Sequence, residues 1–145
     1  MSLESDFEEF VSDEPAAIEQ LRSFVGGELT RCLDLRVESL ALLDEYVTNL
    51  TASPDWDESP LLQNANANVR SWLTVRLAYY LAAVIRSGLG GSWRLEGDEP
   101  VLDLEYINIS PLEIASACLR GEVDGGLSGL YTDLAAELAE RSQAH

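Results

Sequence analysis

The sequence predicts an α+β fold, with a mainly helical layer packed on a small antiparallel sheet. Three observations lead to it. Apolar residues recur at helical spacing over most of the chain, the spacing switches to strict alternation in a few short stretches, and those stretches lie between helical ones. Strands are expected near residues 33–37, 92–96 and 101–109. No repeat or low-complexity linker divides the 145 residues, so a single domain over residues 1–145 is expected.

Two helices are predicted at the N-terminal end of the chain. Residues 1–12 are acidic and place apolar groups on one helical face, at Leu3, Phe7, Phe10 and Val11. We expect this segment to dock on the body as a helix, with a flexible arm or a peptide that a partner recognises as the alternatives. The second helix starts near Ser12 or Asp13, with Pro15 in its first turn, and ends at Gly26-Gly27.

The hydrophobic period changes in the next segment. Apolar and polar residues alternate in LDLRV, which predicts a short strand at 33–37. From Ser39 the spacing is helical again and predicts a helix at about 39–51. A continuous helix over 28–51 is the alternative.

A loop and the longest helix follow. Residues 51–59 are expected to form an acidic loop around Trp56, without the glycine and the ligand spacing of a calcium loop. Residues 60–87 are predicted to be mostly helical, and their apolar density from Val69 onward indicates a helix that is covered on most sides. Gly88 is expected at its left-handed C′ position.

The C-terminal third is predicted to start with a hairpin and to end with two helices. Strands at 92–96 and 101–109 flank GDEP, a turn sequence. Ser110 then caps a helix that stops at Gly121, because Pro111 at N1 and Glu113 at N3 complete a helix-start pattern. The last amphipathic helix is expected at about 127–141.

The composition excludes several kinds of chemistry. The chain has no lysine, so it forms no Schiff base and offers no P-loop lysine. Its one histidine is His145, the last residue, which removes the usual general base and most zinc sites. Cys32 and Cys118 match no metal or redox spacing; they are expected as core thiols in a reducing compartment, with a disulfide between them as the alternative. No cofactor is expected.

The charge balance points to the kind of partner. Asp and Glu number 26 against nine arginines, which gives a net charge of −17. Such a surface repels phosphate backbones and anionic lipids, so neither nucleic acid nor membrane is expected, and a basic protein is the favoured partner. The acidic N-terminus lacks the basic region of a signal peptide, and the longest apolar run is too short to span a bilayer, so a cytoplasmic location is expected.

A few residues are candidates for contact with a ligand or partner. Arg76 lies among apolar residues and is expected in a structural salt bridge, with contact to a ligand as the alternative. Asp103 and Glu105 are two apart on a predicted strand and would point the same way, about 7 Å apart, as a metal or acid–base pair requires; a solvated strand face is the simpler interpretation. The full set of candidates is Arg76, Tyr79, Trp93, Asp103, Glu105 and Trp56.

Four short segments between residues 39 and 131 follow a pattern seen in other proteins. They are Ser39-Leu40 with Leu43-Asp44-Glu45-Tyr46, AYYLAAVI at 78–85, LGGSWR at 89–94 and INISP at 107–111. In these segments the chain resembles a family of small bacterial proteins of unknown function. The resemblance implies a helix, a turn into a strand and a further helix, and it brings no established activity, cofactor or partner. The chain departs from the family pattern at Ala82-Ala83, where that pattern has Gly-Glu, and by one extra residue at 108–111.

The function expected from these observations is binding without catalysis. The leading hypothesis is a protein-interaction module, of an immunity-like or regulatory kind, whose acidic surface attracts a basic partner. One alternative is an enzyme or small-ligand binder built on carboxylates and a divalent metal. Another is that the acidity reflects adaptation to salt or to genome composition and has no binding role.

Overall fold

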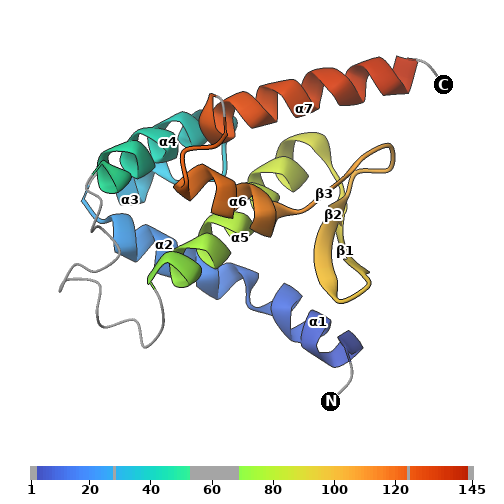
Figure 1. The fold of residues 1–145 in the computed structure, drawn as a ribbon, viewed down its shortest axis with the longest axis horizontal. Helices are drawn as coiled ribbons and strands as arrows, with labels where there is room; N and C mark the ends of the chain where they lie inside the picture. The colour runs from blue at the N-terminus through green and yellow to red at the C-terminus, as the bar shows by residue number, and fades with distance from the viewer. Residues whose placement is uncertain (1–2, 28, 53–68, 124, 144–145) are drawn as a thin grey trace.

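A computed structural model describes residues 3–27, 29–52, 69–123 and 125–143. Helices surround one long helix and a small sheet lies at one end, so the predicted α+β class is confirmed (Figure 1). The helices are α1 (Leu3–Ser12), α2 (Glu14–Val25), α3 (Leu29–Cys32), α4 (Val37–Thr51), α5 (Val69–Leu89), α6 (Pro111–Leu119) and α7 (Gly126–Gln143). The strands are β1 (Ser92–Glu96), β2 (Glu99–Asp103) and β3 (Asn108–Ile109).

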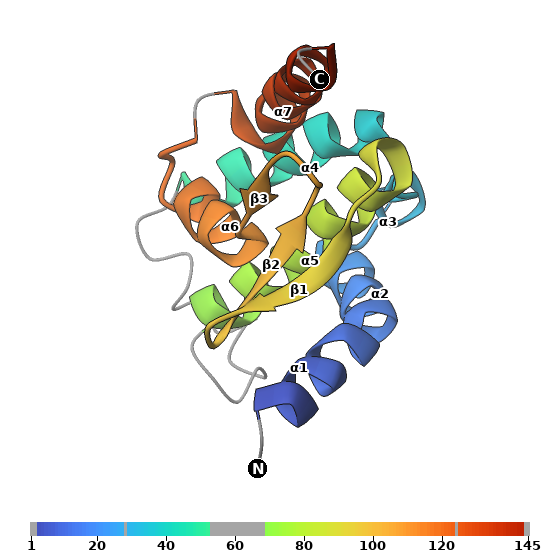
Figure 2. The ribbon, with the colours of Figure 1, turned by 90° about the vertical axis from the view of Figure 1, so that its right-hand side faces the viewer.

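Helix α5 is the centre of the core. Every residue from Leu77 to Ile85 is buried, which requires cover on all sides of the helix, as its apolar density predicts. Helices α2 and α6 pack on it, while α4 and α7 pack against each other and also contact it. Figure 2 shows the sheet in front of α5, with α1 and α2 beside the sheet. None of the helices in the described ranges combines the length and apolarity needed to cross a membrane.

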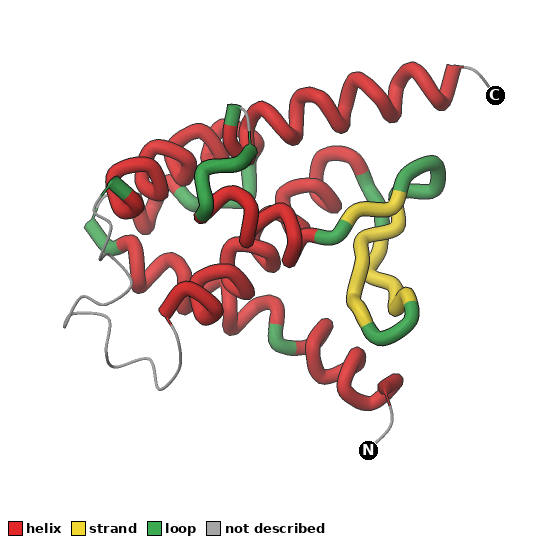
Figure 3. The backbone as a smooth tube through the Cα atoms, viewed as in Figure 1, coloured by secondary structure: helices red, strands yellow, loops and turns green. Residues whose placement is uncertain are grey.

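The sheet is antiparallel, in the order β1-β2-β3. Figure 3 shows its strands in yellow, gathered at one end of the molecule. Its inner row is Trp93, Leu102 and Ile109, which are directly opposed across the three strands. The strand predicted at 92–96 is confirmed as β1, and a two-residue turn after it leads into β2.

The single strand predicted at 101–109 is wrong. The chain turns back after Asp103: Leu104 N–H donates to the Ile107 carbonyl at 2.9 Å, and Glu105 has a φ of 76°. Residues 108–109 then pair with the strand that they follow. Period-2 alternation continues through a tight turn, so the pattern cannot show where a strand reverses.

The strand predicted at 33–37 is also wrong, and so is the alternative of a continuous helix over 28–51. Helix α3 ends at Cys32 and α4 begins at Val37. Between them Leu33 is buried and Leu35 has a φ of 70°. No neighbouring strand is available in the described structure, and side chains serve the backbone of this segment instead.

Two of those side chains come from distant helices. Arg22 Nε donates to the Leu33 carbonyl at 2.7 Å. Tyr80 Oη accepts from Leu35 N–H at 3.0 Å and lies 2.6 Å from Ser39 Oγ, which itself donates to the Arg36 carbonyl. Each hydroxyl has one proton, so the Tyr80 hydroxyl donates to Ser39 and every group in this chain of hydrogen bonds is satisfied.

The end of α5 differs from the prediction. The helix continues to Leu89, and Gly90, with a φ of 85°, takes the position expected of Gly88. Gly88 is needed for another reason, since Tyr131 of α7 lies directly over it: a Cβ there would be 2.1 Å from the Tyr131 hydroxyl oxygen.

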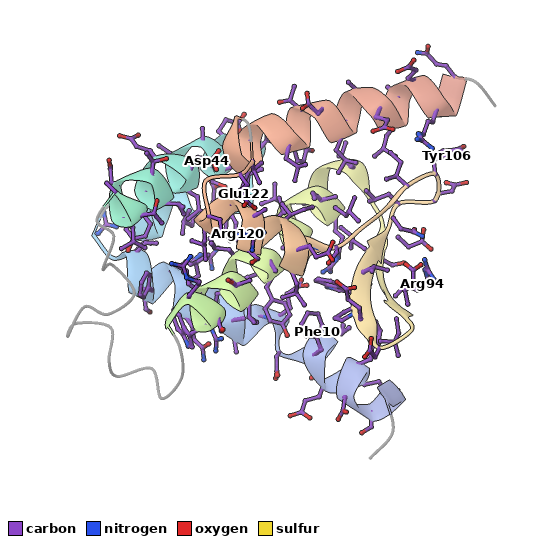
Figure 4. All side chains as sticks on the ribbon, in the orientation of Figure 1. Phe10, Asp44, Arg94, Tyr106, Arg120 and Glu122 are labelled. Atoms are coloured by element: carbon purple, nitrogen blue, oxygen red, sulfur yellow. The ribbon has the colours of Figure 1, made fainter. Side chains whose placement is uncertain are left out.

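Two helix starts depend on polar side chains. Ser110 caps α6 as predicted, accepting from Glu113 N–H at 3.3 Å. The start of α7 is capped from another helix: Asp44 of α4 accepts from Leu127 N–H at 2.7 Å and from Ser128 N–H at 2.9 Å (Figure 4). Burial raises the pKa of Asp44, and the two N–H groups oppose that rise.

Candidate functional site

The strongest candidate site lies where α1 meets α5 and β1, and three aromatic rings form its base. Phe10 of α1 points toward the body of the molecule (Figure 4). Its ring stacks on Tyr79 at a centroid distance of 4.6 Å and meets Trp93 edge-on at 5.0 Å. Tyr79 Oη donates to the Phe10 carbonyl at 2.6 Å. These contacts attach α1 to the core, as the expected docking of this segment as a helix requires.

A buried carboxylate, Glu14, lies beside the rings. It comes from the first turn of α2 and is 8% exposed. Arg86, in the last turn of α5, donates to its two oxygens at 2.5 and 2.6 Å, and Trp93 Nε1 donates at 2.6 Å. A buried charge needs such partners, so the glutamate joins α2, α5 and β1 at one point.

Tyr79 is held in its neutral form at this site. Burial, with further contributions from the negative charges of Asp13 and Glu14, raises its pKa to about 12. Its hydroxyl therefore keeps its proton at neutral pH and acts as a hydrogen-bond donor.

Two open grooves meet at Arg86 and Gly91. One, of about 590 Å³, lies between α2, α5 and the segment after α3, with Ile18 and Leu35 among its lining residues. The other, of about 540 Å³, lies between α1 and the start of β1. Both volumes are in the range of sites that hold a small ligand or a few side chains of a partner.

Charges are unevenly paired over the described structure, and two of the paired arginines, Arg22 and Arg86, line these grooves. Six arginines form ion pairs with carboxylates of the chain itself: Arg22, Arg36, Arg86, Arg94, Arg120 and Arg141. On α1, by contrast, Asp6, Glu8 and Glu9 are exposed, and none makes a side-chain hydrogen bond or ion pair with another described residue. Six of the nine arginines thus have carboxylate partners within the chain, while the three acids of α1 are exposed without such partners among the described residues.

Arg76 and Tyr79 line one cavity of about 310 Å³, together with Asp13 and Gln20. The salt bridge expected for Arg76 is wrong for the described part of the chain, where its guanidinium donates to Gln20 Oε1 at 2.9 and 3.0 Å and lies 4.4 Å from the Trp72 ring centroid. Burial lowers the pKa of Arg76. A neutral amide and an aromatic face are sufficient here because much of the guanidinium stays in contact with water.

Asp103 and Glu105 do not form the predicted pair on one strand face. Asp103 Oδ1 accepts from Glu105 N–H at 2.9 Å, and β2 ends between the two residues. Asp103 instead pairs with Arg94 at 3.3 Å, on the side of the sheet away from the helices (Figure 4). With its amide oriented to satisfy both neighbours, Asn108 donates to Asp103 and accepts from Arg94, so the three strands share one polar row.

The remaining sequence candidates have separate outcomes. Trp56 lies outside the described residues, as do residues 53–68 of the expected loop and helix. Cys118 is buried, as expected, but Cys32 is exposed, so the expectation of a core thiol is wrong for Cys32. Both thiols are free, so the alternative of a disulfide between them is wrong. Burial, with the nearby charge of Asp44, raises the pKa of Cys118 to about 11. Among the described residues, no group of three or more His, Cys, Asp or Glu is placed to hold a metal ion.

Glu14, Arg86 and Phe10 were not identified from the sequence as site residues. In a chain with 26 acidic residues, a buried glutamate looks like any surface acid. A weak signal was present for Arg86, which lies in the last turn of the long central helix, next to the glycine-rich turn. Trp93 and Tyr79 were among the candidates, and the structure brings these two together, with ring centroids 6.2 Å apart.

Comparisons with protein-family models, curated proteins and solved structures found no match for the chain. The motif-based resemblance to a family of small bacterial proteins therefore stays a prediction.

Proposed function

We propose that the protein is a non-catalytic interaction module that binds a basic protein through the acidic outer surface of α1. The observation that carries the proposal is the uneven pairing of charge. Asp6, Glu8 and Glu9 are exposed and unpaired within the described residues, whereas six arginines already have carboxylate partners in the chain.

Electrostatics explains what such a surface does. A cationic partner meets few competing positive groups, and the long-range field of a chain with net charge −17 accelerates its approach. The partner's identity would then depend on contacts next to the acids, and the module would neutralise or regulate that partner by covering its basic surface.

The test separates a local site from general negative charge. A fluorescein-labelled peptide of eight arginines is titrated with the wild type and with two triple variants, and binding is followed by anisotropy. One variant neutralises α1: Asp6→Asn, Glu8→Gln, Glu9→Gln. The control neutralises exposed, unpaired acids elsewhere: Glu38→Gln, Glu45→Gln, Asp133→Asn. Both variants have a net charge of −14 instead of −17.

The expected result is a loss of affinity confined to the α1 variant. Three exposed charge pairs contribute together about 1–2 kcal/mol, so the α1 variant should bind about tenfold more weakly. The control should change affinity by less than about twofold, because its acids lie on α4 and α7 rather than on α1, and salt at 0.1 M screens exposed charges that the peptide does not contact. Equal losses of affinity in both variants would show that the peptide responds to the general negative charge of the surface, and would contradict the proposal.

A further inference from the structure

The groove between α1 and β1 has apolar walls, and two of its apolar side chains, Phe7 and Val11, are not packed in the core. Phe7 and Val11 of α1 line one side, and Trp93 lies on the other. Phe10 is the residue of α1 that packs against the core, whereas Phe7 and Val11 are half-buried and turned to the groove. An amphipathic helix normally covers such side chains with its own protein, so these two offer a contact surface.

The charge around this groove is negative. Arg86 reaches the groove, but both oxygens of Glu14 accept from its guanidinium. Glu8 lines the groove without a side-chain partner among the described residues, and Asp6 and Glu9 are exposed on the same helix. A segment that places apolar groups in the groove therefore meets the carboxylate of Glu8 at its rim.

The neighbouring strand favours an extended occupant. β1 is an edge strand, since its one strand neighbour in the sheet is β2. Figure 2 shows α1 on the side of β1 away from β2. An extended peptide beside an edge strand alternates its side chains between two directions, with one set directed into the groove and the other toward the rim.

On the basis of the proposed function, we infer that this groove binds an extended segment of a basic partner protein in which basic and apolar residues alternate. The apolar side chains pack against Phe7, Val11 and Trp93. The basic side chains reach Glu8. Apolar burial supplies the affinity, and the carboxylates select cationic partners over acidic ones.

The experiment uses two labelled peptides of equal charge, RVRVRV and RSRSRS, and the full chain. Wild type should bind RVRVRV about tenfold more tightly, the effect of burying one or two valine side chains. The double variant Phe7→Ala, Val11→Ala should lose that preference and still bind RSRSRS as wild type does. A matched control, Val37→Ala with Leu42→Ala, removes exposed apolar side chains from α4 and should keep the preference.

A further variant, Glu8→Gln, leaves the apolar walls in place and should weaken the binding of both peptides by a similar factor. If the Phe7/Val11 variant loses RSRSRS binding, α1 itself has detached in that variant. The Glu8→Gln variant then decides: weaker binding of both peptides supports the inference, and unchanged binding overturns it. Equal binding of RVRVRV and RSRSRS to wild type would overturn the groove as the binding site; the proposed function would stand if eight arginines still bind through α1. Failure of all three cationic peptides to bind would overturn both.

Discussion

Replacing Gly88 with alanine tests how closely α7 lies over α5. A Cβ at this position would be 2.1 Å from the Tyr131 hydroxyl oxygen and 3.3 Å from the ring carbon that carries it. Non-bonded heavy atoms rest about 3.5 Å apart, so the hydroxyl has to move by roughly 1.4 Å. Tyr131 is 8% exposed, which leaves its ring little room to move.

Two opposing terms determine the size of the effect. Overpacking of this kind costs about 1–3 kcal/mol. Alanine stabilises a helix interior by about 1 kcal/mol relative to glycine, and by somewhat less in the last turn. We therefore expect Gly88→Ala to lower the free energy of unfolding by about 1 kcal/mol. In a Tyr131→Phe background the hydroxyl is gone, and Gly88→Ala should then raise the free energy of unfolding by up to about 1 kcal/mol.

Urea unfolding of wild type, both single variants and the double variant provides the measurement. The double-mutant cycle should give a coupling of about 2 kcal/mol, with the dependence on urea unchanged. If Gly88→Ala shifts stability equally in both backgrounds, the Tyr131 hydroxyl does not lie over Gly88 and the packing of α7 on α5 is described wrongly.

Three further predictions concern buried polar groups. Tyr80→Phe leaves Leu35 N–H without its acceptor and should lower the free energy of unfolding by about 1–3 kcal/mol in urea titrations; no change would contradict the hydrogen-bond chain. Asp44→Asn weakens the cap of α7 and should cost about 1–3 kcal/mol in the same assay, whereas exposed Asp133→Asn should cost under about 0.5 kcal/mol; equal costs would argue against the cap. The pKa of Tyr79 rises from 10.0 to about 12 on folding, so the folded state keeps this proton longer and stability should fall as pH rises between these values. Tyr79→Phe should make this fall of stability with pH shallower. Identical dependence of the free energy of unfolding on pH in wild type and variant would refute the prediction.

Local signals were enough to place most helices. Ser110, Pro111 and Glu113 fixed the start of α6, because a cap acts through its own backbone neighbours within one turn. The amphipathic spacing likewise placed α1, α2 and α7, and the uniform apolar character of α5 identified the centre of the core.

The sequence was insufficient where a distant group sets the conformation. The segment at 33–36 alternates like a strand, but Arg22 and Tyr80 hold its backbone, and neither is near it in sequence. The chain reversal after Asp103 was not predicted either, because the alternation of apolar and polar residues continues through the turn. The pairing of Glu14 with Arg86 and Trp93 joins residues 72 and 79 positions apart.

The sequence by itself determined the fold class, the absence of lysine chemistry and the strongly negative charge, because these follow from composition and from contacts within a few residues. Tertiary structure alone decided which polar groups of distant segments meet. Local spacing already allows ion pairs such as Arg22 with Glu19 and Arg141 with Glu137, each within one helix. The pairing of buried Glu14 with Arg86 depends instead on how α2 packs on α5, and no pattern within a few residues sets that distance.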